Sequence, residues 1–288
     1  MIKKIYCLGT SHTRGAGFHL PEAKEIYNRI VNTPSMETCS WPGILKTYVD
    51  DIEVINLSEA GAGNERMYRL VFDLVTNPKF KKEETLFLLE LSDLGRKEFY
   101  SNTIDDYVIC NYVSTHPPGN NFDVVWKYYE NEKLLPKHIK KIYADFLVET
   151  VNFDDLIQKL QMNILFFLNF LKNNQINFEL TVFGDVFSPT QKKIFNLDYE
   201  SIKYDINGKL LPSFYCKEVY ENYLFEHETN NVIKDEHQGY WITEITAKTI
   251  FNHLVRKKYI EKDIKEIKNT HSDFLEFKNK LNLKNFLI

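Results

Sequence analysis

The chain has 288 residues, of which 43% are hydrophobic and 26% are charged, and this ordinary globular composition excludes a collagen-like or disordered protein. The 36 basic and 40 acidic side chains give a formal net charge of −4, which argues against general nucleic-acid binding. The length provides ample material for a core, in one large domain or two small ones.

Four apolar runs are predicted to form the strands of a sheet. Residues 2–8 form the first run, which ends at Gly9, and residues 52–57 form the second. Residues 85–91 are almost continuously apolar, as expected for a parallel sheet with helices on both faces. The fourth run covers residues 178–183.

Helical patterns separate these runs. Helices are expected over residues 21–30, where Pro21 opens the pattern, and over 41–48. A further helix is expected after the turn that ends at Asn64, with Met67, Leu70, Val71 and Leu74 on one face. Residues 158–171 are expected to be part of a long helix, and residues 240–254 to form a late one. Strands that alternate with helices at this spacing predict an α/β protein. The expected architecture is a three-layer α/β/α sandwich with a parallel central sheet.

The segment at residues 101–152 interrupts the alternation. It is rich in aromatic side chains and contains His116-Pro117-Pro118-Gly119. We interpret it as a helical insertion over the sheet, either a lid or a segment whose aromatic side chains only pack together. Residues 1–255 are therefore predicted to form a single domain with this insertion, and residues 256–288 to form a C-terminal helical extension.

Targeting and redox signals are absent from the sequence. No run of 18 apolar residues is present, so no membrane-spanning helix is predicted. The N-terminus lacks the apolar segment of a secretory signal peptide, and the four cysteines form neither a CxxC pair nor a metal-ligand spacing. These features predict a cytoplasmic protein with reduced thiols, no metal and no other cofactor.

Polar residues after the predicted strands are the candidates for a site, because ligands of parallel α/β sheets bind beyond the carboxyl ends of the strands. Ser11 follows the first strand in a turn that contains Gly9 and Gly15, where its hydroxyl can face a cleft. The simpler interpretation of this segment is an ordinary strand-to-helix turn.

The second candidate turn is Gly61-Ala-Gly63-Asn64. Position 66 is Arg rather than a third glycine, and no acidic residue ends the following strand, so a dinucleotide fingerprint is excluded. The first turn likewise lacks the Gly-Lys-Ser/Thr of a phosphate loop. A glycine N–H and the Asn64 amide can instead face Ser11 across neighbouring strands.

Two further polar groups complete the candidates. Ser92, Asp93 and Arg96 follow the third strand, where ordinary helix capping is the alternative. Asp235 and His237 precede the last amphipathic helix. A carboxylate two residues from a histidine can orient the imidazole, which can then accept the proton of a serine hydroxyl.

Together these blocks resemble the SGNH/GDSL hydrolase superfamily over residues 1–100, 178–184 and 235–254. The matching blocks are Gly9-Thr-Ser11-His-Thr-Arg-Gly15, then Asn56-Leu-Ser58-Glu-Ala-Gly61, and finally Asp235 with His237. The resemblance implies a flavodoxin-like sheet with Ser11 as nucleophile, His237 as its base and Asp235 as the residue that orients the base. It also implies that Gly61 donates a backbone N–H to an oxyanion.

The third block departs from the superfamily pattern of Gly-x-Asn-Asp. Ser92 stands where the asparagine of the oxyanion hole is expected, so Asn64 or Ser92 is expected to act as the third donor. The substrate-contact candidates are His12, Gly63, Asp93 and Arg96. The whole pattern resembles a divergent branch found in phages and environmental microbes.

The resemblance implies a serine esterase, and the aromatic insertion favours a carbohydrate that carries an acetyl-like acyl group as the substrate. The alternative is a binding or structural protein on the same fold, for example a phage virion or tail component with weak or no catalysis. The expected partner is a small-molecule or glycan ester, with self-association or virion assembly as further options and no nucleic acid or membrane. A metal hydrolase is disfavoured, since His227-Glu228 lacks the second histidine of HExxH.

Overall fold

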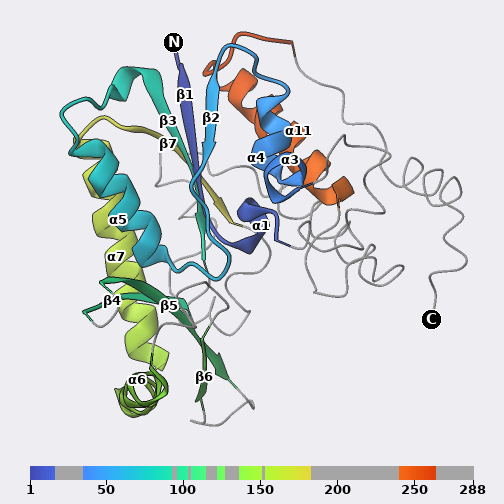
Figure 1. Cartoon of the computed structure of the whole chain (residues 1–288). Helices are drawn as coiled ribbons and strands as arrows, with labels where there is room; N and C mark the ends of the chain where they lie inside the picture. Colours follow the sequence, from blue (N-terminus) through green and yellow to red (C-terminus); the bar gives the residue numbers. More distant parts are fainter. Residues whose placement is uncertain are drawn as a thin grey trace, which may run out of the picture.

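The protein was analysed as a computed structural model (Figure 1), which describes residues 1–16, 35–92, 96–102, 105–114, 122–126, 136–150, 153–182 and 240–263. The central sheet has four parallel strands in the order β2 (Glu53–Asn56), β1 (Lys4–Leu8), β3 (Thr85–Leu91) and β7 (Asn177–Val182). Chain order reverses between β1 and β3, which is where flavodoxin-like sheets bind ligands.

One face of the sheet is covered by α4 (Trp41–Lys46) and α11 (Tyr240–Arg256), with the short α3 (Met36–Cys39) beside α4. α4 begins at Ser40, whose Oγ accepts a hydrogen bond from Gly43 N at 3.3 Å, and Pro42 occupies the first turn, where no N–H is needed. The core on this face includes Ile5, Cys7, Trp41, Leu45, Leu86, Leu88, Ile250, Phe251 and Leu254.

The opposite face is covered by α5 (Asn64–Val75) and α7 (Phe153–Asn173), which run side by side in Figure 1. Its core includes Leu8, Met67, Val71, Phe87, Leu89, Leu91, Ile164, Phe167 and Leu171. Successive residues of β3 alternate between the two cores, so all seven residues of the strand are buried. The predicted three-layer α/β/α sandwich with a parallel central sheet is therefore confirmed.

The segment after β3 corrects the prediction of a helical insertion. It contains α6 (Lys137–Thr150) but also an antiparallel sheet of β4 (Arg96–Ser101), β5 (Asp106–Ser114) and β6 (Phe122–Trp126). The β-branched and aromatic residues of β5 favour an extended chain, and this preference outweighs the helical interpretation. A left-handed residue, Asp105 with φ 53°, lies in the connection between β4 and β5.

The small antiparallel sheet is held against α5 by charged side chains. Arg69 on α5 donates to both carboxylate oxygens of Glu98 on β4, at 3.1 and 3.0 Å. Its guanidinium carbon also lies 3.7 Å from the ring centroid of Tyr107 on β5. Lys97 of β4 pairs with Glu65 of α5 at 2.6 Å. The insertion is thus attached to the helix that begins at the second candidate turn.

Three expected features lie wholly or mainly outside the described residues: the helix over residues 21–30, the segment around His116 and the C-terminal extension beyond residue 263. A short 3-10 helix, η1 (Lys82–Glu84), leads into β3. Of the helices that the structure describes, none combines the length and the apolar character needed to cross a membrane.

Candidate active site

Ser11 is the first residue of α1 (Ser11–Arg14), a single helical turn that follows β1 at the carboxyl edge of the sheet. Thr10 is the N-cap of this turn, and the helix ends at Gly15, whose φ of 78° closes the turn in a left-handed conformation. Ser11 is 3% exposed. The predicted nucleophile therefore lies at the switch point of the sheet, in a buried turn.

A buried carboxylate holds this turn on the sheet. Glu90, the sixth residue of β3, is 3% exposed and accepts three hydrogen bonds from residues on either side of Ser11. Thr10 donates its backbone N–H at 3.0 Å and its Oγ1 hydroxyl at 2.8 Å, and Thr13 donates its Oγ1 hydroxyl. The first turn and the central strand are thus joined by side-chain bonds beyond the last backbone pairing of β1 with β3.

The close approach of Glu90 requires a glycine at position 9. A Cβ atom built on Gly9 would lie 2.2 Å from Glu90 Oε2 and 2.7 Å from Thr13 Oγ1, far inside van der Waals contact. The absent side chain therefore provides the space through which the carboxylate reaches the turn.

The second turn, after β2, is joined to the first by Asn56. Its Nδ2 donates to the backbone oxygen of Thr13 at 3.0 Å, while its Oδ1 accepts the N–H of Ser58 at 3.1 Å and also the Ser58 hydroxyl. Glu59 N donates to Gly9 O at 3.2 Å. These bonds bring the first and second turns together at the edge of the sheet.

Gly61 is buried within the second turn and has a φ of 79°, a conformation that residues with a Cβ rarely adopt. Gly63 is the N-cap of α5 and offers that helix no side-chain cap. The backbone of the second turn lies beside the Ser11 turn, and the oxyanion role of Gly61 stays a prediction.

Asn64 joins the second turn to the third. Its Nδ2 donates to Ser92 O at 3.0 Å, and its Oδ1 accepts Ser92 N at 2.8 Å, so the amide forms a reciprocal pair with the backbone after β3. Asn64 is 5% exposed and Ser92 is 3% exposed. The Ser92 hydroxyl is buried and has no hydrogen-bond partner within the described part of the chain.

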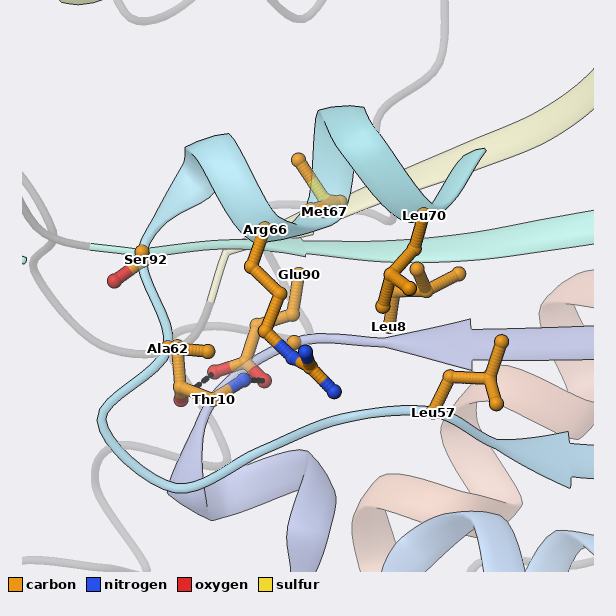
Figure 2. Close-up of a pocket in the computed structure, with 11 residues that line it drawn as sticks. Leu8, Thr10, Leu57, Ala62, Arg66, Met67, Leu70, Glu90 and Ser92 are labelled. Atoms are coloured by element: carbon orange, nitrogen blue, oxygen red, sulfur yellow. Dashed lines mark hydrogen bonds between the residues drawn. The ribbon is translucent and has the colours of Figure 1, made fainter. Parts of the chain in front are cut away.

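The three turns line one small pocket next to α5, and Figure 2 shows its side chains between that helix and the ends of the strands. Its empty volume is about 230 Å³, part of which is open to solvent. Arg66 projects from α5 toward the ends of β1 and β2, and its Nη1 lies 3.6 Å from Glu98 Oε1. The lining residues are Leu8, Gly9, Thr10, Leu57, Ala62, Gly63, Arg66, Met67, Leu70, Glu90 and Ser92.

The structure brings together the three turns that carry Ser11, Gly61 with Asn64, and Ser92, and of these predicted residues Ser92 lines the pocket between the turns. His12 lies in α1, and Arg96 is the first residue of β4. Three predicted site residues lie outside the described part of the chain: Asp93, Asp235 and His237. The catalytic pairing of Ser11 with His237 therefore stays a prediction.

Sequence reasoning missed the residues that support the turns, chiefly Glu90, Thr13 and Asn56. A signal for Glu90 was present, because it is the one acidic residue in a strand that is otherwise apolar except for its first residue. A carboxylate rarely occupies a fully buried position without hydrogen-bond partners. The threonines that bind it carry no comparable signal, since their side chains are common in ordinary turns.

The other potential nucleophile near the site is Cys7, two residues before Gly9. Cys7 is fully buried on β1, and burial raises the pKa of its thiol well above the ordinary value. Such a thiol stays protonated and unreactive at neutral pH. Among the described residues, no group of three or more His, Cys, Asp or Glu side chains is placed to hold a metal ion.

Comparison with known proteins identifies similar folds. No protein-family model matches the sequence, and no curated protein matches it. The psychrotrophic esterase EstA from Pseudoalteromonas sp. is 15% identical, with a TM-score of 0.45 and coverage of 90% of this chain and 100% of EstA. A protein assigned to the G-D-S-L lipolytic family from Desulfitobacterium hafniense DCB-2 is 14% identical, with a TM-score of 0.42 and coverage of 86% and 98%. With identities below 25% and TM-scores below 0.5, neither protein's activity is transferred to this chain.

Proposed function

We propose that the protein is a serine ester hydrolase of the SGNH type with Ser11 as its nucleophile. The observation that carries the proposal is the meeting of three strand-end turns, the first of which contains Ser11, at the switch point of a parallel sheet. Hydrogen bonds from Thr10 to Glu90, from Glu59 to Gly9 and between Asn64 and Ser92 hold these turns together. Parallel α/β proteins bind ligands at this place, and the sequence puts a serine there.

In the proposed reaction, His237 accepts the hydroxyl proton while Ser11 Oγ attacks the carbonyl carbon of an ester, and Asp235 holds the imidazole in position. The tetrahedral intermediate collapses as the C–O bond of the ester breaks, and the departing alcohol takes the proton from His237. Water activated by His237 then attacks the acyl-serine, which releases the acid and restores the Ser11 hydroxyl.

Backbone N–H groups supply the first part of the proposed oxyanion hole. The Thr10 side chain makes no capping hydrogen bond to α1, and its hydroxyl donates to Glu90. The N–H of Ser11 belongs to the first turn of α1, where the helix provides no acceptor. This arrangement supports Ser11 and Gly61 as backbone donors to the oxyanion.

The third donor is Asn64 or Ser92. Asn64 uses one of its two Nδ2 hydrogens on Ser92 O, so a single hydrogen remains for a substrate. The Ser92 hydroxyl also offers one hydrogen and has no partner in the described structure. Loss of one oxyanion donor typically costs about 3 kcal/mol of barrier, so this departure from the superfamily asparagine predicts slow turnover.

An acyl group on a carbohydrate is our proposed substrate. Tyr100 and Tyr107 of the small sheet are 45% and 36% exposed, with ring centroids 5.3 Å apart. Aromatic rings of this kind offer apolar faces to sugar rings. Arg69 lies over the Tyr107 ring, which leaves Tyr100 as the better platform of the two. The net charge of −4 supports a small-molecule or glycan ester rather than nucleic acid.

The test compares the purified protein with Ser11→Ala, using p-nitrophenyl acetate turnover and labelling by a fluorophosphonate. Ser11 is 3% exposed, so labelling also tests whether the hydroxyl becomes accessible to an ester. We expect S11A to lose labelling and at least about 1,000-fold of the turnover. Ser101→Ala is the matched control, because Ser101 is an equally buried serine at the end of β4.

Equal turnover and labelling of wild type and S11A would contradict the proposal. That result would favour a non-catalytic binding or structural role on the same fold, such as a virion component. Two observations favour this second function: the burial of Ser11 and the serine at position 92 in place of an asparagine. A further variant, His237→Ala, tests the base, since labelling that survives this change would mean that another group activates Ser11.

A further inference from the structure

We infer that Glu90 is a positioning residue for the nucleophile, and this inference rests on the proposed function. Within the described part of the chain, the hydrogen bonds of Glu90 go to Thr10 and Thr13, on either side of Ser11, and not to the Ser11 hydroxyl. Its effect on the reaction would therefore be exerted through the backbone of the turn.

The first support is the pattern of hydrogen bonds at the carboxylate. Oε1 accepts the Thr10 hydroxyl at 2.8 Å, while Oε2 accepts the Thr10 N–H at 3.0 Å and the Thr13 hydroxyl. An ionised carboxylate has only acceptor sites and can take all three hydrogens. Because Thr10 and Thr13 flank Ser11, the two ends of the nucleophile's turn are tied to one rigid strand.

The second support is a directed chain of hydrogen bonds behind Thr13. The indole Nε1 of Trp41 donates to Thr13 Oγ1 at 3.1 Å, and the Thr13 hydroxyl donates its single hydrogen to Glu90. Trp41 is 1% exposed in the core between α4 and the sheet. The rotamer of Thr13 is therefore fixed from both sides, by the core and by the carboxylate.

The third support is the fit of Gly9 around the carboxylate. The space that its missing side chain leaves is filled by Glu90 Oε2 and by the Cβ of the same residue, 2.2 and 2.6 Å from where a Cβ on Gly9 would lie. The turn and the carboxylate are packed as one unit. Displacement of either would shift the Ser11 backbone, and a shift of about 1 Å at a reacting group can cost about 100-fold in rate.

The chain offers a matched control in Glu179 on β7. Glu179 is also 3% exposed and lies in the same sheet, on the strand beside β3. Its carboxylate is bonded to His253 Nε2 at 3.0 Å and lies 3.8 Å from Lys257 Nζ, so among the described residues its partners are on or just after α11 and not in the Ser11 turn. A Gln at this position removes a buried carboxylate without touching the turn.

The experiment measures kcat and KM for p-nitrophenyl acetate, the second-order rate of fluorophosphonate labelling and the melting temperature, for full-length wild type, Glu90→Gln and Glu179→Gln. We expect E90Q to lose about 10- to 100-fold in kcat and in labelling rate, with KM within about twofold. E179Q is expected to melt earlier but to keep the wild-type kcat and labelling rate.

A second pair of variants keeps the test decisive if E90Q does not fold. Thr13→Val removes the hydroxyl at almost constant volume, and Thr13→Ser keeps it. We expect T13V to lower kcat and T13S to restore most of what T13V loses, because only the serine can donate to Glu90. Equal kcat values for these two variants would overturn the inference.

The remaining outcomes separate the inference from the function on which it rests. If wild-type Ser11 reacts and E90Q reacts equally fast, the positioning role is wrong while the hydrolase proposal stands. If E90Q and E179Q lose activity only in proportion to their loss of folded protein, Glu90 is structural and the inference is wrong. If wild type and S11A have equal turnover and equal labelling, the proposed function is wrong, and the inference about Glu90 is wrong as well.

Discussion

At the scale of single residues, the site depends on one position where a side chain is absent. Gly9 lies against Glu90 so closely that a methyl group would overlap the carboxylate and the Thr13 hydroxyl. The residue is therefore needed for close approach. Its φ is not in the left-handed region that otherwise favours glycine.

We predict that Gly9→Ala destabilises the protein by about 1–3 kcal/mol, the usual cost of overpacking a tight interior. It should also slow fluorophosphonate labelling of Ser11, since the turn must move away from Glu90. Urea unfolding followed by circular dichroism measures the first effect, and labelling well below the transition measures the second. Labelling at the wild-type rate would mean that the geometry of the turn does not depend on this contact.

Other single residues show how much of the candidate site the sequence predicts. Ser11, Asn64 and Ser92 could be predicted because polar residues directly after apolar strands must lie at the carboxyl edge of a parallel sheet. The Asn64 amide was predicted to face the nucleophile, but in the structure it forms a reciprocal pair with the Ser92 backbone. Hydrogen-bond partners depend on distances across the sheet, and residue order alone does not contain these distances.

At the scale of elements, the end of α11 is fastened to β7 by buried polar groups. Glu179 of β7 pairs with His253 of α11 and lies near Lys257 and Tyr259, which follow in the chain. Burial, with a smaller contribution from the charge of Glu179, raises the pKa of Tyr259 to about 12. This attachment holds the C-terminal end of α11 against the edge strand of the sheet.

Stability should therefore fall in alkaline solution through Tyr259. An unfolded tyrosine ionises near pH 10, whereas the folded one stays neutral to about pH 12, so the stabilisation is complete below pH 10 and is lost as pH rises through 12. We predict that Tyr259→Phe loses less melting temperature than wild type between about pH 9 and about pH 11. Thermal melts across this range test the prediction, and parallel curves for the two proteins would contradict it.

Element types were predictable where the hydrophobic period was clear. The strand at residues 85–91 has the predicted bounds, and the helix at 240–254 extends only slightly further in the structure. The helix that carries Met67 and Val71 begins at Asn64, which was predicted to belong to the preceding turn. The strands of the insertion were less predictable. Residues 106–114 were noted for their aromatic content, and that content alone does not predict a strand. An antiparallel hairpin also depends on contacts with α5 that lie far away in the sequence.

At the scale of the whole molecule, two cores lie on the two faces of one sheet. Both described cysteines whose side chains are placed, Cys7 and Cys39, are fully buried, and burial raises the pKa of each thiol. Cys7 lies in the core between the sheet and α11. The reactivity of Cys7 therefore reports the opening of the packed layers, whereas that of Cys39 reports exposure of the end of α3.

We predict that iodoacetamide alkylates Cys7 and Cys39 at least about 100-fold more slowly in the native protein than in the unfolded chain. Peptide mass spectrometry at increasing urea concentrations measures each site separately. Alkylation should follow the unfolding transition seen by circular dichroism. Rapid alkylation of Cys7 below that transition would show that the α11 layer separates from the sheet while the rest stays folded.

The architecture as a whole was predictable from the order of elements, because strands that alternate with helices can bury their apolar residues only in a layered sandwich. The position of Asp235 and His237 relative to Ser11 was not predictable, because residues 183–239 show no clear hydrophobic period. A layered fold fixes which edge of the sheet carries a site, and the loops decide which side chains arrive there.

The side chains of β3 alternate between the two faces of the sheet, so Glu90 affects the alignment of the strand during folding as well as the proposed chemistry. If β3 slipped by one residue against β1, every side chain would change faces, and the carboxylate would enter the apolar layer beneath α5 and α7. The hydroxyls of Thr10 and Thr13 would then lose their acceptor. A misaligned sheet would thus bury a carboxyl group without hydrogen-bond partners, so the residue that holds the Ser11 turn also favours the correct alignment of β3.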